Sequence, residues 1–152
     1  MTGAVIAETS PRLSVIVVNW NGLEHLPACF DSLAAQTFRD FEVIMVDNGS
    51  RDDSVEFVRS RYPWVRLVPL AENTGFATGN NRGLEHARGD CIVTLNNDTR
   101  VEPDWLEVLV RVADAHPRAG MVASRVCAFD DPDLIDSIGM SICRDGMARG
   151  RF

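Results

Sequence analysis

The sequence predicts an α/β fold in which a mostly parallel, Rossmann-like sheet carries helices on both faces. The first observation is that apolar runs, typical of strands buried on both faces, alternate with segments of helical periodicity. The second is that three of these runs end in polar clusters, as strands do beside a ligand crevice. Repeated strand and helix order of this kind implies right-handed crossovers and a doubly wound sheet.

The first half of the chain supplies three strands and two helices. The run Leu13–Val18 is apolar except for Ser14, so it predicts a central strand. A helix begins near Pro27, and the pair Asp53 and Glu56 is typical of a capping box that opens a second helix toward Tyr62. The other two predicted strands are Phe41–Val46 and Val65–Val68.

The second half continues the alternation and then changes character. A helix over Phe76–Arg88, closed by Gly89, precedes a strand over Cys91–Leu95, and Pro103 opens a helix that His116-Pro117 stops. Met121–Val126 is a fifth apolar segment. Beyond Cys127, the Asp130–Asp133 stretch predicts a loop, and alternating apolar residues before Asp145-Gly146 predict a short hairpin near the C-terminus.

Length and composition indicate one globular domain. The 152 residues suffice for a substantial core, so we expect residues 1–12 to form an N-terminal extension and residues 13–152 to form the domain. No apolar run is long enough to span a bilayer and the start lacks a signal-peptide pattern, which favours a cytoplasmic protein. The four cysteines are widely spaced and predict reduced thiols without a zinc site.

The charge pattern excludes several classes of function. A net charge of -7 without a basic run argues against nucleic acid as a partner. All 15 basic residues are arginine, which excludes a Walker phosphate loop, Schiff-base catalysis and kinase-like phosphoryl sites, because each needs a lysine. An anionic nucleotide would therefore require metal ions, backbone amides and arginines.

Three polar clusters follow the predicted strands, namely Asn19-Trp20-Asn21, Asp47-Asn48-Gly49-Ser50 and Asn96-Asn97-Asp98. Because the carboxyl ends of parallel strands share one edge, the clusters would line a single crevice. There Asp47 could accept an N–H from a base, and Asp98 could bind a divalent cation. Each cluster also has a purely structural interpretation, such as an Asx turn between Asp47 and Gly49 or a helix-capping role for the third cluster.

A glycine stripe lies between the second and third clusters. Gly75, Gly79 and Gly83 recur every fourth residue, so on a helix they would leave a bare surface for close packing. We expect this stripe mainly to pack on the sheet. We expect Asn81 and the helix start near Gly75 to face the crevice, where free N–H groups would favour an anion.

Four segments together resemble the family 2 glycosyltransferases, in the order that this family shows. They are Ser14–Asn21, Val46–Asp52, Asn73–Asn81 and Leu95–Asp98. The resemblance extends from Leu13 to about Gly146. The Gly-Phe-Ala and Gly-Asn-Asn elements are similar to the branch of rhamnosyltransferases and galactofuranosyltransferases.

The resemblance implies a GT-A fold that binds a dTDP-, UDP- or GDP-sugar and transfers the sugar with inversion, in cell-wall or polysaccharide biosynthesis. It implies that Asn19 lines the nucleotide pocket, that Asp47 recognises the base and that Asn48 lies near the ribose. The loop at Gly75 would close over the nucleotide. The triplet Asn96-Asn97-Asp98 occupies the place of the family's Asp-x-Asp motif, so Asp98 is the expected ligand of Mg or Mn, with Asn97 beside it on the donor.

The resemblance assigns no general base within the chain, because the family's acidic motif would lie beyond Phe152. Asp130, Asp131, Asp133 and Asp136 are available carboxylates, but their polar context favours a solvated loop. Two hypotheses follow: a glycosyltransferase completed by a continuation or a partner, and a nucleotide-sugar-binding fragment without activity. The expected acceptor is a saccharide or a lipid-linked saccharide, the latter through a peripheral contact with the inner membrane face, and the sequence leaves the oligomeric state open.

Overall fold

The computed structural model describes residues 10–142 and 148–150. Two units are present, one that ends at Val101 and one that begins at Glu102, and each is described by itself. Most of the expected N-terminal extension and the Asp145-Gly146 turn lie outside the described residues.

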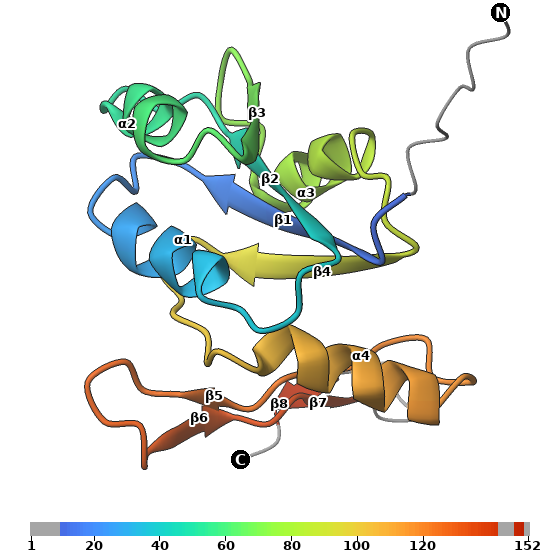
Figure 1. The fold of residues 1–152 in the computed structure, drawn as a ribbon. Helices are drawn as coiled ribbons and strands as arrows, with labels where there is room; N and C mark the ends of the chain where they lie inside the picture. Colours follow the sequence, from blue (N-terminus) through green and yellow to red (C-terminus); the bar gives the residue numbers. More distant parts are fainter. Residues whose placement is uncertain (1–9, 143–147, 151–152) are drawn as a thin grey trace, which may run out of the picture. The chain divides into compact units, whose positions relative to one another are not determined.

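Four parallel strands form the sheet of the first unit (Figure 1). They are β1 (Leu13–Asn19), β2 (Phe41–Asp47), β3 (Val65–Pro69) and β4 (Cys91–Asn96), in the order β3-β2-β1-β4. All seven residues of β1 are buried, because this strand has a neighbour on each side and a helix layer on each face. In register, Asn19 pairs with Asp47 and Val18 pairs with Asn96. The polar residues that end the strands therefore share one edge.

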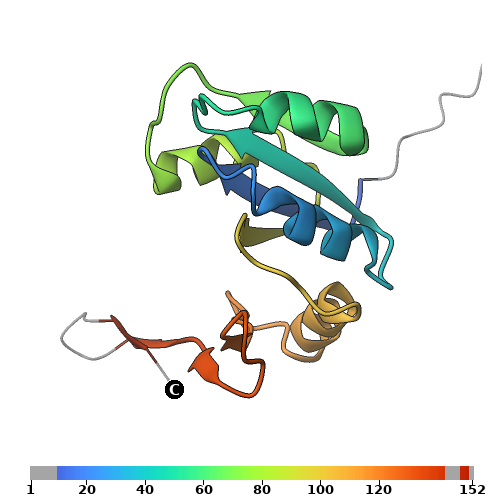
Figure 2. The ribbon, with the colours of Figure 1, turned by 90° about the vertical axis from the view of Figure 1, so that its left-hand side faces the viewer.

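Helices cover both faces of this sheet. Figure 2 shows α1 (Leu26–Ala34) and α2 (Ser54–Arg61) on one face and α3 (Phe76–Leu84) on the other. The connections from β1 to β2 and from β2 to β3 move along the sheet in one direction, and the connection from β3 to β4 moves back past β1. Right-handed crossovers therefore place α3 on the face opposite α1 and α2. The predicted α/β, doubly wound fold class is confirmed.

Two glycines allow α3 to approach the sheet closely. A Cβ atom on Gly79 would lie 2.9 Å from Val18 Cγ1, and one on Gly83 would lie 2.5 Å from Ile16 Cγ2. These two positions pack as predicted. Gly75 does not, because it precedes the helix with φ +85° and a Cβ there would meet nothing within 4 Å. Its conformation, rather than close packing, explains why glycine suits this position.

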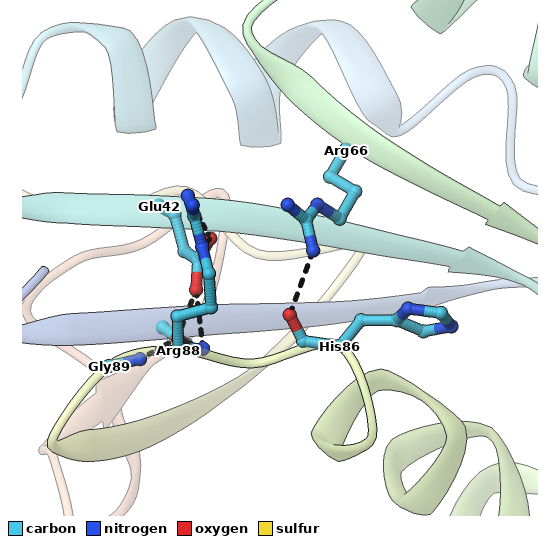
Figure 3. Close-up of polar contacts among 6 residues, drawn as sticks. Glu42, Arg66, His86, Arg88 and Gly89 are labelled. Atoms are coloured by element: carbon cyan, nitrogen blue, oxygen red, sulfur yellow. Dashed lines mark hydrogen bonds and ion pairs between the residues drawn. The ribbon is translucent and has the colours of Figure 1, made fainter. Parts of the chain in front are cut away.

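The third helix ends four residues earlier than predicted, at Leu84 instead of Arg88. The backbone N–H of Arg88 donates to Glu42 Oε1 at 2.7 Å, and that of Gly89 donates to Ser14 Oγ at 2.8 Å (Figure 3). Tertiary partners on the strands thus replace the helix carbonyls, so Gly89 is not the carboxyl-terminal cap of α3.

The predicted capping box of the second helix is also wrong. Asp53 is the N-cap residue but makes no side-chain cap bond. Asp52 accepts hydrogen bonds from the N–H and the hydroxyl of Ser54 instead, at 3.1 and 2.5 Å. Glu56 pairs with Arg59 on the surface. The first helix agrees better with the sequence, because it begins at Leu26 with a proline in its first turn.

The described residues of the second unit form one helix and two antiparallel strand pairs. The helix α4 (Trp105–Ala115) ends before His116-Pro117 as predicted. Strand β5 (Val126–Cys127) pairs with β6 (Ile135–Ser137), so only Val126 of the fifth apolar segment is in a strand, and it does not extend the parallel sheet. Strands β7 (Met140–Ile142) and β8 (Ala148–Gly150) form the predicted hairpin. Among the described residues, no helix has the length and apolar character needed to cross a membrane.

Candidate functional site at the carboxyl edge of the sheet

Asn19, the last residue of β1, joins the three polar clusters. Its side chain is fully buried. Its Nδ2 donates to Asp47 Oδ1 at 3.1 Å and to Ser50 Oγ at 3.2 Å. Its Oδ1 accepts from Asn97 Nδ2 at 2.8 Å. One amide therefore contacts residues of the second and third clusters, which are 28 and 78 positions away in the sequence.

Asp47 ends β2 and is 2% exposed. Its Oδ2 accepts the N–H of Ser50 at 3.0 Å, and Gly49 between them has φ +75°. The carboxylate therefore closes a turn through Gly49, although it accepts from Ser50 and not, as in the predicted Asx turn, from the N–H of Gly49. The turn uses one carboxylate oxygen, while the other accepts from Asn19. Each oxygen retains a lone pair, so the turn and a further hydrogen bond to a ligand are compatible.

Asn48 fixes the loop that precedes α3. Its Oδ1 accepts from the N–H and the hydroxyl of Thr74 at 2.9 and 3.1 Å. Its Nδ2 donates to Asn73 Oδ1 at 3.0 Å and to the Gly75 carbonyl at 3.2 Å. Asn48 is 2% exposed, so this buried amide holds the loop in place. Its predicted place near a ribose is not tested by this geometry.

The start of α3 lies at the end of that loop. Gly75 is the N-cap residue, and no side chain caps the helix start. The backbone N–H of Gly75 donates to Asn73 Oδ1 at 2.9 Å. Asn81 is exposed and lies about 160° to 200° around the helix from Gly79 and Gly83, which face the sheet. It is not drawn into the hydrogen-bonded cluster, and its contact with a donor stays a prediction.

The triplet after β4 combines one exposed carboxylate with two amides. Asn97 donates to Asn19 through Nδ2, which leaves its Oδ1 available, and Asp98 next to it is exposed. No group of three or more His, Cys, Asp or Glu residues that could hold a metal is present among the described residues. Asp98 is thus a carboxylate that would need oxygen ligands of other kinds to complete a metal shell.

A buried thiol supports the same strand end. Burial and the nearby charge of Asp98 raise the pKa of Cys29 to about 12. The neutral thiol donates to the backbone carbonyl of Asn96, with an S···O distance of 3.9 Å. Because a thiolate is the reactive form of cysteine, Cys29 is a structural residue.

Three features of the edge were not identified from the sequence: the joined loops, the hydrogen bonds of Asp52 and the close fit at Gly22. The N–H of Asn21 donates to Ser50 Oγ at 2.9 Å, and the N–H of Leu23 donates to Asp52 Oδ2 at 3.1 Å, so the loops after β1 and β2 are joined. Burial raises the pKa of Asp52, but hydrogen bonds from Ser54 and Leu23 lower it overall. Trp20, a member of the first predicted cluster, is 56% exposed.

Gly22 is the third feature. A Cβ atom there would collide with the amide of Asn97 and would lie 2.6 Å from Asn19 Oδ1. The sequence offered weak signals for these residues: an Asn-Gly pair after β1 and the Ser-Arg-Asp-Asp run after Gly49.

The fold and this edge define a class of protein: an open, doubly wound α/β domain with a cluster of amides around Asp47 and an exposed carboxylate, Asp98, where its strands end. More specifically, the chain belongs to glycosyl transferase family 2, whose family model matches residues 14–145. The predicted family and its GT-A fold are confirmed.

Three relatives illustrate the match. N-acetylglucosaminyl-diphospho-decaprenol L-rhamnosyltransferase of Mycobacterium tuberculosis is 31% identical over 132 residues, which cover 80% of this chain and 42% of that protein. The crystal structure of S. aureus TarS 1-349 in complex with UDP matches with a TM-score of 0.65 at 26% identity. The match covers 70% of this chain and 33% of the TarS chain. Mannosyltransferase PcManGT from Pyrobaculum calidifontis, in complex with GDP-Man and Mn²⁺, has a TM-score of 0.68 at 26% identity, with coverages of 83% and 38%. This chain spans less than half the length of each.

Proposed function

We propose that this chain is the donor-binding part of an inverting glycosyltransferase that takes a sugar from a dTDP-, UDP- or GDP-sugar. The observation that carries the proposal is the cluster in which Asn19 contacts both Asp47 and Asn97. It holds a carboxylate suited to a base and a triplet suited to a metal and a diphosphate at one edge. The structures of relatives with UDP, or with GDP-Man and Mn²⁺, support a donor of this class.

At the base end of the proposed donor site, Asp47 would accept an N–H from the nucleobase. Asn19 and the turn at Ser50 orient its carboxylate, so little reorganisation accompanies binding. Trp20 would offer its exposed ring for stacking. Asn48 would act on the nucleotide mainly through the loop at Gly75, where the open glycine lets backbone come close to a ligand.

At the diphosphate end, the residues present fit a Mg or Mn ion bound together with the donor. Asp98 would supply one carboxylate oxygen and Asn97 an amide oxygen, and magnesium-type sites commonly take their remaining ligands from phosphates and water. When bound, such an ion supplies Lewis-acid stabilisation of the diphosphate leaving group. The chain's own contribution is to place the two oxygens and the start of α3 toward that charge.

The acceptor and the proton-accepting group complete the proposed reaction. Direct displacement at the anomeric carbon inverts its configuration and needs a base for the acceptor hydroxyl. No described carboxylate has contacts that assign it this role. The name of the rhamnosyltransferase relative describes a lipid-diphosphate-linked saccharide. It supports an acceptor of that kind for this chain, reached by a peripheral membrane contact in cell-wall or polysaccharide synthesis.

Calorimetric titration with UDP, dTDP and GDP, each with and without Mn²⁺, tests the donor site. We expect one nucleotide to bind, and Mn²⁺ to tighten its binding about tenfold or more, a size like the roughly 10- to 100-fold losses of metal affinity seen when residues that support a metal site are mutated. Asp98→Ala should abolish the Mn²⁺ effect while nucleotide binding without metal remains. Asp104→Ala, an exposed acid of the second unit, is the matched control and should keep the effect.

Absence of binding for all three nucleotides, with and without metal, would refute the donor site. The second hypothesis, a nucleotide-sugar-binding fragment without activity, is favoured by the lack of an assigned base among the described residues. It predicts the same binding but no sugar transfer or donor hydrolysis. Incubation with the radiolabelled donor that corresponds to the bound nucleotide separates the two.

A further inference from the structure

The hydrogen bonds around Asn19 run in one direction, and the charge on Asp47 sets that direction. A carboxylate can only accept hydrogen bonds, so the amide of Asn19 must present its Nδ2 to Asp47. Its Oδ1 then faces the opposite way, toward Asn97. Asn97 must therefore donate from its Nδ2 to Asn19 Oδ1, at 2.8 Å. The Oδ1 of Asn97 then lies on the side away from Asn19.

We propose that Asn19 is a positioning residue that transmits this polarity, so that the carboxylate of Asp47 determines which end of the Asn97 amide is presented beside Asp98. The inference rests on the proposed function, because the Oδ1 of Asn97 matters only if a cation and a diphosphate bind there. It adds that the orientation of Asn97 at the diphosphate end depends on Asp47 at the base end, through the buried side chain of Asn19.

Burial is the reason that the relay holds. Asn19 is 0% exposed and Asp47 is 2% exposed, so water cannot replace the partners of these groups. Rotating the Asn19 amide by 180° would oppose its Oδ1 to the Asp47 carboxylate and its Nδ2 to that of Asn97. The contact with the Asp47 carboxylate would become repulsive whichever way the Asn97 amide turns, and a buried polar group left without a partner is costly. The reversed orientation is therefore excluded beside this carboxylate.

Three variants separate the links of the relay. Asn19→Ala removes both links. Asp47→Asn keeps the shape of the carboxylate but removes the charge that fixes the direction. Gly22→Ala places a methyl group 2.6 Å from Asn19 Oδ1 and against the Asn97 amide, so it acts directly on the two groups of the second link. Because Gly22 does not have a left-handed φ, alanine there adds no backbone strain, and this variant covers the case in which Asn19→Ala does not fold.

The measurement is the ratio of UDP dissociation constants without and with Mn²⁺, obtained by calorimetry, with dTDP or GDP used if the wild type prefers it. We expect this ratio to fall toward one in all three variants, as in Asn97→Ala. The matched control is Asn80→Ala, which removes an amide that bonds only within α3, to the Phe76 carbonyl, and should keep the wild-type ratio.

A double-mutant cycle tests transmission itself. Asp47→Asn and Asn97→Ala should be coupled in the wild type, with a departure from additivity of about threefold or more in UDP affinity with Mn²⁺. The coupling should vanish in the Gly22→Ala background. The side-chain amide resonances of Asn97, in spectra of the ligand-free protein, should shift in Asp47→Asn and not in Asn80→Ala.

The outcomes distinguish the two proposals. If the wild type binds none of the three nucleotides, the proposed function fails and this inference fails with it. If a nucleotide binds with a Mn²⁺ effect, but Asn19→Ala or Gly22→Ala leaves that effect and the coupling unchanged, the donor site stands and the relay is refuted.

Discussion

The two edges of the parallel sheet are held together by different chemistry. At the carboxyl edge, the neutral amides of Asn19, Asn48 and Asn97 make the contacts between loops. At the amino edge, the carboxylate of Glu42 accepts from Ser14 and from the backbone and guanidinium of Arg88 (Figure 3). Amides can orient groups without neutralising them, so Asp98 at the carboxyl edge stays exposed and each oxygen of Asp47 keeps a lone pair. The amino edge uses its charges internally.

The amino edge also shows why a surface groove is not enough to identify a site. A groove there is lined by residues that include Glu42, Trp64, Arg66 and Arg88. Its arginines already have partners, since Arg66 donates to the His86 carbonyl at 3.1 Å and Arg88 pairs with Glu42 at 3.1 Å (Figure 3). We therefore expect substitutions at this edge to change stability, and substitutions at the carboxyl edge to change nucleotide binding.

The largest expected effect is on stability, from Gly89→Val at the amino edge. A Cβ atom at this position would lie 2.5 Å from Ser14 N and 2.6 Å from the Leu13 carbonyl carbon, and backbone atoms of a central strand cannot move aside easily. Overpacking of this kind should lower the free energy of unfolding by about 3 kcal/mol. Urea denaturation followed by circular dichroism measures it.

The control for this substitution is Gly120→Val, where a Cβ would meet nothing within 4 Å and only a small change is expected. UDP affinity of the folded Gly89→Val protein should equal that of the wild type. A variant of full stability with weakened UDP binding would show that the amino edge takes part in donor binding, and would break the contrast between the edges.

A smaller effect, on binding alone, is expected for Trp20→Ala. Trp20 is 56% exposed next to the end of β1, so its removal should change unfolding by less than about 0.5 kcal/mol. If the ring stacks on the base, UDP affinity should fall about tenfold, since base stacking on an aromatic ring is worth about 1–3 kcal/mol. Calorimetry of the variant measures the change.

Trp64→Ala provides the opposite control from the amino edge. Trp64 makes edge-to-face contacts with Phe30 and Tyr62, at centroid distances of 6.3 and 6.2 Å. Its removal should lower stability and leave UDP affinity unchanged. Equal losses of affinity in the two tryptophan variants would mean that both report on folding rather than on stacking.

The sequence predicted those features of the sheet that depend on local patterns. Apolar runs identified the four strands, and the polar residues at the ends of β1, β2 and β4 identified the edge where ligands bind in folds of this type. Gly79 and Gly83 were correctly expected to pack, because a four-residue spacing places them on one side of a helix.

The partners of each polar group could not be predicted, because they depend on contacts between distant segments. Asn19 and Asn97 are 78 positions apart, and Asn48 holds a loop 25 to 27 positions away. The same reason explains the wrong end of α3. Its local pattern continues to Arg88, but Ser14 and Glu42 bind the backbone there, and tertiary hydrogen bonds override the helical pattern.

The smallest expected effect is the loss of stability in Glu42→Gln at the amino edge, which should depend on pH. Burial raises the pKa of Glu42, but hydrogen bonds from Ser14 and Arg88, together with the Arg88 charge, lower it overall. A lowered pKa in the folded state means that Glu42 stabilises the fold above the ordinary carboxyl range, near pH 4 to 5, and that this contribution disappears as the pH falls through its lowered pKa. Because the guanidinium of Arg88 is half exposed and therefore screened, Glu42→Gln should cost only about 1 kcal/mol at pH 7.

The measurement for Glu42→Gln is the free energy of unfolding of both proteins between pH 7 and pH 3. The difference should be constant near neutrality and should shrink in the acid range, while acid sensitivity due to Asp52 remains in both proteins. Glu56→Gln, which breaks an exposed pair with Arg59, should differ little from the wild type at any pH. A difference that grows on acidification would contradict an ionised Glu42 in the fold. If UDP affinity also stays unchanged in Glu42→Gln at pH 7, the carboxylate of Glu42 at the amino edge serves the fold alone.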